Sequence, residues 1–174
     1  MQIDSMLAFN ALSSLAAALA VFAAWRSVVV TRRAAEGQLL LMLLTEYSRP
    51  EMANSLRILG AWRNDHDANY AAAWKAARDA KDPAALQLDA ARRMVSHFFF
   101  RIACLRRAKL IGSSSQRELC ELDGLGVYFR VVEGFEEVIN LNYSRWPFAM
   151  LKELCVKFNK NYGVHPSAPQ LPSN

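Results

Sequence analysis

Apolar residues are unevenly spread along this 174-residue chain, and the longest uninterrupted run lies near its start. The stretch Leu7 to Trp25 has nineteen residues without one charged side chain, and Arg26, Arg32 and Arg33 follow it. As a helix this run is about 28 Å long, close to the roughly 30 Å of a bilayer's hydrocarbon core. The pattern therefore predicts a single transmembrane anchor.

Two other interpretations of this run are a cleaved signal peptide and a buried helix of a soluble protein. A signal peptide has a positively charged start, an apolar run of roughly 7–15 residues and a cleavage site of small residues. Ala18-Leu19-Ala20 could serve as that site. However, the first six residues contain Asp4 and no Lys or Arg, and the apolar run is longer than usual. We therefore favour the anchor.

Positive charges lie on one side of the predicted anchor. None precedes it, whereas Arg26, Arg32 and Arg33 follow within eight residues. Because basic residues favour the cytoplasmic side, we expect a single-pass protein of the inner (cytoplasmic) membrane with its N-terminus outside and its C-terminal domain cytoplasmic. An odd number of cysteines without paired spacing suits such a reducing compartment. These are Cys104, Cys120 and Cys155.

Small side chains recur at helical spacing within the anchor, on two neighbouring stripes. Such faces let a second helix approach closely, and packing is the main driving force for helix association in lipid. A polar residue near the outer end would prefer a partner over hydrocarbon. The alternative is that alanine merely propagates the helix. The predicted packing face consists of Asn10, Ser13, Ala16, Ala17, Ala20 and Ala24.

After the anchor, apolar residues recur at i, i+3, i+4 and i+7, which predicts an all-α chain. The first helix should continue beyond the anchor to Ser48, since no proline interrupts residues 27–47. Pro50 and Pro83 predict the first turns of two further helices. Val127 to Val132 is rich in aromatic and β-branched residues, but it has no obvious pairing strand, so we expect a helix there too.

The strongest helical pattern runs from Leu86 to Ile111, and we expect the stretch from Ala91 to Ile111 to be the centre of a small helical bundle. Its predicted buried face comprises Val95, Phe98, Phe99, Ile102 and Leu105, widened by Phe100. Weaker patterns predict short helices over 116–122 and 148–161. The predicted organisation is an anchor over 1–33, a helical cytoplasmic domain over 34–162 and a proline-rich extended tail over 163–174.

Charge separates into two blocks within the predicted domain. Residues 90–117 hold seven basic side chains and no acidic one, and residues 118–137 hold six acidic side chains and one arginine. The blocks could neutralise each other, or the basic block could face anionic lipid or an acidic protein. Nucleic acid is not an expected partner, because the phenylalanines that could stack on bases are expected to point inward. The candidate basic surface comprises Arg26, Arg32, Arg33, Arg92, Arg93, Arg101, Arg106 and Arg107.

Candidate chemistry changes this picture little. The histidines His66, His97 and His165 lie in unrelated segments, and a zinc site needs three or four converging ligands. There is no Cys-x-x-Cys, P-loop or nucleophile elbow in the sequence. Cys104 is expected to be a small core residue of the central helix. The sequence therefore predicts no enzyme, no metal and no cofactor.

Several short motifs resemble a widespread group of uncharacterised bacterial proteins. They are residues 47–52 (YSRPEM) with Leu56 and Leu59, residues 91–96 (ARRMVS) with the apolar positions that follow, and Leu110-Ile111. The resemblance covers roughly residues 5–160 and implies one N-terminal membrane helix and a helical cytoplasmic domain, without an activity or catalytic residues. Relatives often have an acidic residue and a glycine where Phe100 and Lys109 stand here.

The small-residue face of the anchor and the lack of a catalytic motif favour a non-enzymatic accessory or scaffold subunit of a larger integral membrane complex, for instance respiratory, photosynthetic or transport. Its expected partners are other membrane-protein subunits and membrane lipid. The alternative is a membrane-tethered binding module for anionic lipid or an acidic protein.

Overall fold

A computed structural model describes residues 2–139, 145–160 and 162, with side chains from Leu15 onwards. Every element in that part of the chain is helical, which confirms the all-α prediction. The chain divides into two compact units, residues 1–39 and residues 40–174. The predicted division, between residues 33 and 34, lies six residues earlier.

The first unit is a single helical segment. It is the larger part of α1, Gln2–Tyr47, which continues without a break past the apolar run, as predicted. Alanine and leucine dominate it, and both are strong helix formers. The helix ends where Ser48 Oγ donates a hydrogen bond to the Leu44 carbonyl oxygen at 2.8 Å, two residues before Pro50. Residues 40–47 at this end belong to the second unit, where Leu43 is fully buried.

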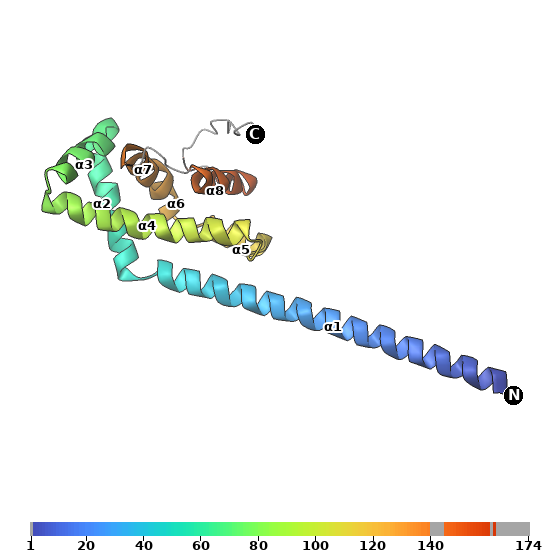
Figure 1. Cartoon of the computed structure of the whole chain (residues 1–174). Helices are drawn as coiled ribbons and strands as arrows, with labels where there is room; N and C mark the ends of the chain where they lie inside the picture. Colours follow the sequence, from blue (N-terminus) through green and yellow to red (C-terminus); the bar gives the residue numbers. More distant parts are fainter. Residues whose placement is uncertain (1, 140–144, 161, 163–174) are drawn as a thin grey trace. The chain divides into compact units, whose positions relative to one another are not determined.

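The second unit is built on two long helices, α2, Pro50–His66, and α4, Pro83–Arg107, which pack against each other (Figure 1). Both begin at a proline, as predicted, because proline has no N–H to lose in the first turn. The Asp82 carboxylate caps α4 by accepting the Ala84 N–H at 2.8 Å. Between them lie a short 3₁₀ turn, η1 (Asp67–Asn69), and α3, Tyr70–Asp79.

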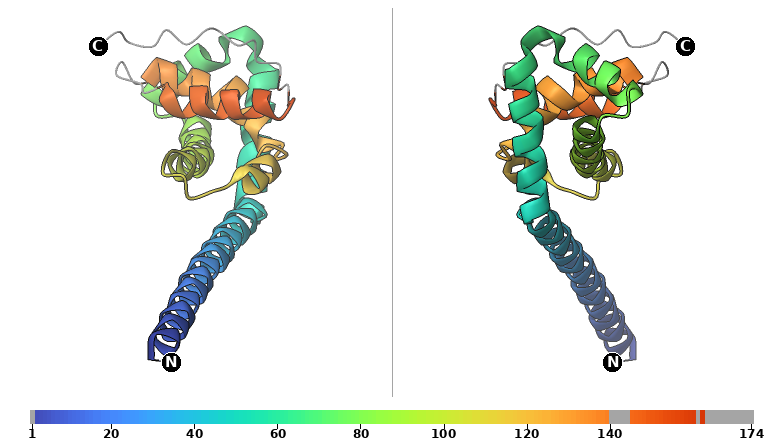
Figure 2. Two further views of the ribbon diagram at one scale, coloured as in Figure 1. Left: turned by 90° about the vertical axis from the view of Figure 1, so that its right-hand side faces the viewer. Right: turned by 90° about the vertical axis from the view of Figure 1, so that its left-hand side faces the viewer.

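Short helices complete this unit (Figure 2), and two of them, η2 (Tyr128–Val132) and α8 (Trp146–Lys157), pack against α4. The segment from Val127 to Val132, predicted as helix rather than strand, is indeed helical. Most of it forms a wide π-helical turn, η2. Within η2, the Arg130 carbonyl oxygen accepts hydrogen bonds from Arg63 Nη1 at 2.9 Å and from the Tyr70 hydroxyl at 3.0 Å. The short elements are α5 (Ser113–Leu119), α6 (Gly124–Val127), η2 (Tyr128–Val132), α7 (Glu133–Ile139) and α8 (Trp146–Lys157).

The core lies along the predicted face of α4. Val95, Phe98, Phe99 and Ile102 are each at most 1% exposed. Phe99 packs on Tyr128 of η2 at 4.9 Å between ring centroids. This aromatic contact explains why η2 is helical without a helix-favouring composition: tertiary packing outweighs its local propensity.

Some boundaries and burial predictions were wrong. Phe100 is 45% exposed, so it does not widen the buried face, and Cys104 is only partly buried. The helix α4 ends at Arg107 rather than Ile111, because Lys109 takes a positive φ of 57° that stops the helix. The last helix, α8, ends at Lys157 rather than at residue 161. The predicted tail, 163–174, lies outside the described residues.

Candidate functional site

The described part of α1 exposes a continuous apolar surface. The large side chains of this surface between Leu15 and Trp25 are 56% to 70% exposed. Near the N-terminus, this helix is long and apolar enough to cross a membrane, and none of its most apolar window is buried within the protein. The surface comprises Leu15, Leu19, Val21, Phe22 and Trp25.

The predicted small-residue face is exposed on this helix. Ala16, Ala17, Ala20 and Ala24 are all exposed, whereas the side chains of Asn10 and Ser13 lie outside the described ones. Because successive helical residues are about 100° apart, Ala16, Ala20 and Ala24 share one side and the larger side chains gather on the other.

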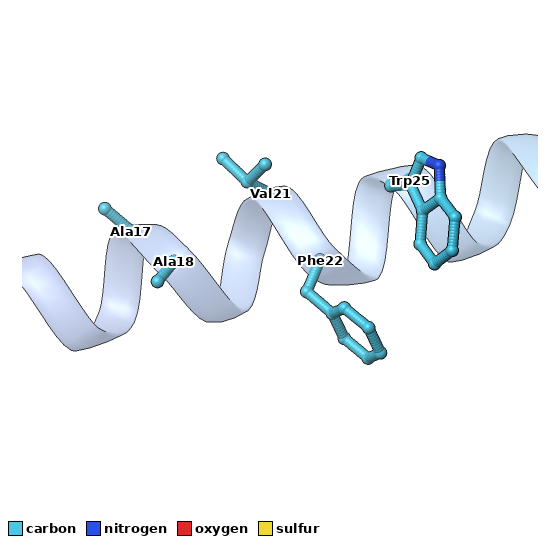
Figure 3. A pocket seen from close by; sticks show the side chains of 5 residues that line it. All are labelled: Ala17, Ala18, Val21, Phe22 and Trp25. Carbon is cyan, nitrogen blue, oxygen red and sulfur yellow. The ribbon is translucent and has the colours of Figure 1, made fainter.

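A shallow apolar depression lies beside this face. Its lining consists of Ala17, Ala18, Val21, Phe22 and Trp25, which are labelled in Figure 3. The Phe22 and Trp25 rings lie with their centroids 6.0 Å apart. The helix therefore offers two shapes to a neighbour: a flat alanine stripe and an aromatic-edged depression.

Of the predicted basic surface, Arg26, Arg32 and Arg33 are exposed on α1. The five arginines of α4 are in a different situation, because each has a contact with a neighbouring carboxylate, carbonyl or ring. The sequence had left open whether this block is neutralised by the acidic block or faces a partner.

Arg92 is the clearest departure, since it is buried at 8% exposure. Its Nε donates a hydrogen bond to Asp89 Oδ1 at 3.0 Å, and its guanidinium pairs with Glu136 of α7. The same guanidinium lies over the Trp74 ring, 5.8 Å from its centroid. Arg92 is therefore a core residue, and its assignment to a partner surface was wrong.

Asp89 is held ionised by this arrangement. Burial raises the pKa of Asp89. The Arg92 charge and the hydrogen bonds from Arg92 and Arg93 together lower it by more, so the net pKa lies below its usual value. The Arg93 Nε donates to Asp89 Oδ2 at 2.9 Å, from a side chain that is 65% exposed.

The remaining α4 arginines also have partners. Arg101 pairs with Glu46 at the end of α1, and Arg106 donates a hydrogen bond to the Met150 carbonyl oxygen. Among the ion pairs of the described residues, Arg92–Glu136 joins the basic block to the acidic block, whereas the pairs of Arg93 and Arg101 do not. Mutual neutralisation of the two blocks is therefore only a small part of how the basic block is balanced.

An aromatic pair, the exposed Phe100 and the partly buried Trp146, lies beside these arginines, and it was not predicted from the sequence. The 45%-exposed Phe100 meets Trp146 edge to face at 5.6 Å, and the Arg107 guanidinium lies over the Trp146 ring at 5.2 Å. Aromatic residues and arginine are the usual anchors of protein interfaces. A signal existed: Phe100 is about 100° from Phe99 around the helix, away from the buried face.

The other residues considered for chemistry do not converge. His97 is exposed, and His66 stacks on Trp62 with 3.8 Å between ring centroids. His165 lies outside the described residues. Within the described part of the chain, no three His, Cys, Asp or Glu side chains are placed to hold a metal ion together.

Comparisons of the chain with known protein families, with curated proteins and with solved structures found no match. The resemblance drawn from its motifs therefore stays a prediction.

Proposed function

We propose that this protein is a non-enzymatic accessory or scaffold subunit of a larger integral membrane complex. The observation that carries the proposal is the exposed apolar surface of α1, where even Trp25 and Val21 are 62% and 70% exposed. A contiguous surface of large, exposed apolar side chains is normally covered by lipid or by protein. An anchor that only tethered a domain would need lipid alone, so the case for a partner depends on the shape of this helix.

The shape favours a helix partner. Ala16, Ala20 and Ala24 form a flat stripe on which a second helix can approach closely, which is how helices associate in lipid. The larger side chains on the opposite side, such as Leu15 and Phe22, suit contact with lipid chains. In the second unit, the exposed Phe100, with the partly buried Trp146 against it, would provide a further apolar contact for a partner.

The proposed location is the inner (cytoplasmic) membrane, with the helical domain in the cytoplasm. Arg26, Arg32 and Arg33 support it, since basic residues flanking a span favour the cytoplasmic side. A C-terminal green fluorescent protein fusion should fluoresce, and a C-terminal alkaline phosphatase fusion should be inactive. Active phosphatase would reverse the proposed orientation.

The central experiment is purification of the C-terminally tagged full chain from native membranes in mild detergent, followed by mass spectrometry. We expect other membrane proteins in stoichiometric amounts. Recovery of this chain alone, or with lipid alone, would refute its role as a subunit.

A matched pair of variants tests the stripe itself. Ala20→Leu places a large side chain on the stripe, and Ala18→Leu places the same side chain about 160° away around the helix. Overpacking a close contact costs about 1–3 kcal/mol, which corresponds to a loss of partner recovery of roughly 5- to 150-fold for Ala20→Leu. Ala18→Leu should retain the partner. If Ala18→Leu were the one to lose it, the partner would use the depression instead.

The second candidate function is a membrane-tethered module that binds anionic lipid or an acidic protein. The exposed parts of Arg93 and Arg101, 65% and 45% of their side chains, favour it. It predicts slower hydrogen exchange over the exposed face of α4 when the full chain sits in nanodiscs of anionic rather than neutral lipid. It also predicts that added salt removes the difference. Equal exchange in both lipids would exclude the lipid form of this function.

A further inference from the structure

Two of the three cysteines lie in contact inside the second unit. The Cys155 thiol of α8 donates a hydrogen bond to the sulfur of Cys120, which directly follows α5, and the two Sγ atoms are 3.7 Å apart. Cys120 is 1% exposed and Cys155 is 3% exposed. Apolar side chains surround them, among them Phe99 of α4 and Leu151 of α8. The third cysteine, Cys104, lies on α4 and is partly exposed.

We propose that Cys120 and Cys155 form an oxidisable dithiol site, which a hydroperoxide converts into an intramolecular disulfide between the end of α5 and α8. The sequence separation of 35 residues gave no indication of this pairing.

The two Sγ atoms are close enough to form a disulfide bond after a small movement. A disulfide has an S–S length of about 2.0 Å, so the sulfurs must approach by roughly 1.7 Å from contact distance. The two residues come from different elements, and no helix would have to unwind within itself to join them. Rotation of the two side chains and a small shift of α8 can supply the movement.

Access to the buried sulfurs comes through the end of α8. Cys155 lies in the last turn of α8, which ends at Lys157, and helix ends open more readily than their middles. The segment after α8 is held against Cys120 by two contacts. The Tyr162 hydroxyl donates to the Cys120 carbonyl oxygen, and Lys160 pairs with Glu121. Opening of this short segment would admit a small oxidant.

The two thiols differ in acidity, which assigns their roles. The hydrogen bond from Cys155 lowers the pKa of Cys120, burial opposes this, and the Arg106 charge lowers it further. The same hydrogen bond and burial raise the pKa of Cys155, which therefore keeps its proton. Cys120 is the nucleophile, because the thiolate is the reactive form.

The reaction has two balanced steps. The Cys120 thiolate attacks one peroxide oxygen, the O–O bond breaks, and the leaving hydroxide takes a proton to become water, which leaves a sulfenic acid on Cys120. The Cys155 sulfur then attacks the Cys120 sulfur, the S–O bond breaks, and the hydroxyl leaves as water with the Cys155 proton. Two thiols and one hydrogen peroxide thus give one disulfide and two waters.

The test uses the full chain in detergent, reduced, then treated with hydrogen peroxide, and finally unfolded in denaturant and alkylated so that buried thiols also react. We expect the wild type to lose two hydrogen atoms in mass and to take up one alkyl group, on Cys104, instead of three. Peptide mapping should find Cys120 linked to Cys155. The disulfide closes a loop of 35 residues, and it should raise the melting temperature by about 5–15 °C.

Cys104→Ser is the matched control, and it should form the disulfide as the wild type does. Cys155→Ser should instead stop at an oxidised, unlinked Cys120. Alkylation of all three cysteines after peroxide treatment would overturn the proposal, and so would a peptide map that links Cys104. Because the wild-type map alone decides the pairing, the test stands even if a variant fails to fold.

Discussion

Arg92 offers the most direct test of how the second unit is held together. Replacing Arg92 with leucine removes the positive charge that faces both Asp89 and Glu136. The two carboxylate side chains are only 11% and 16% exposed, so water replaces little of what they lose. Asp89 keeps Arg93 as a partner, but no other ion pair of the described residues includes Glu136.

The expected cost is large because removing one partner of a buried ion pair leaves a charge uncompensated. Such removals cost about 3–5 kcal/mol, against a total stability of about 5–15 kcal/mol for a typical domain. For a domain of this size, each kcal/mol corresponds to roughly 3–4 °C. Arg92→Leu should therefore lower the melting temperature by about 10–20 °C.

Arg93→Leu is the matched control, since it is the same change one residue further along α4 and it touches the same carboxylate. Its side chain is 65% exposed, and exposed ion pairs contribute about 0–1 kcal/mol. The assay is thermal unfolding of the full chain in detergent, followed by near-ultraviolet circular dichroism, which reports the packed aromatic residues. A shift of only a few degrees for Arg92→Leu, equal to that of Arg93→Leu, would refute the reasoning.

A compensating variant separates charge from packing. Arg92→Met combined with Glu136→Met replaces the pair with apolar side chains while Asp89 retains Arg93. Replacing buried ion pairs in this way is often neutral or stabilising. The double variant should therefore recover most of the stability that Arg92→Leu loses. If it is no more stable than Arg92→Leu, the loss comes from packing and not from the unpaired charge.

Three further predictions concern single groups in the second unit. The pKa of Asp89 is lower in the folded chain than in the unfolded chain, so its stabilising effect is complete above about pH 4 and is lost as the pH falls through the folded pKa. Asp89→Asn should therefore make the free energy of unfolding depend less on pH below about pH 4. Gly134→Ala would place a Cβ 2.0 Å from the Tyr70 hydroxyl, and it should lower the free energy of unfolding in urea by about 1–3 kcal/mol. At Gly60 no atom lies within 4 Å of a new Cβ, so Gly60→Ala should raise the free energy of unfolding by about 0.5–1 kcal/mol. Equal effects of the two alanines would contradict this. Tyr47→Phe leaves a backbone N–H of α6 without its 2.9 Å acceptor and should cost about 1–3 kcal/mol, and an unchanged urea midpoint would show that water replaces the hydroxyl.

The sequence predicted best where one residue type imposes a backbone constraint. Pro50 and Pro83 begin α2 and α4 because proline fixes φ and lacks the N–H that a later helical position would need. The face containing Val95 and Phe99 was predictable because about three turns of regular spacing reinforce one another.

Arg92 shows where this reasoning failed. It lies four residues after Leu88 and three before Val95, so the helical period places it on the buried side of α4. Because it is an arginine, it was instead predicted to lie on the exposed basic surface. The partner that makes its burial possible, Glu136, is 44 residues away on α7. Sequence spacing gives no sign of such a contact, and the same holds for the meeting of Cys120 and Cys155.

The burial of Arg92 also changes what the basic block means for function. With Arg92 in the core and Arg106 hydrogen-bonded to a backbone carbonyl oxygen, two of the five α4 arginines are withdrawn from any partner surface. Arg93 and Arg101 already have carboxylate neighbours, which weakens their attraction for an anionic surface. The exposed side chains of α4 include the apolar Phe100, at 45%, as well as Arg93 and Arg101. Because two of these arginines are withdrawn and two more are already paired, charge is a weaker basis for docking than the sequence implied, and this favours the proposed subunit of a membrane complex over the proposed module that binds anionic lipid.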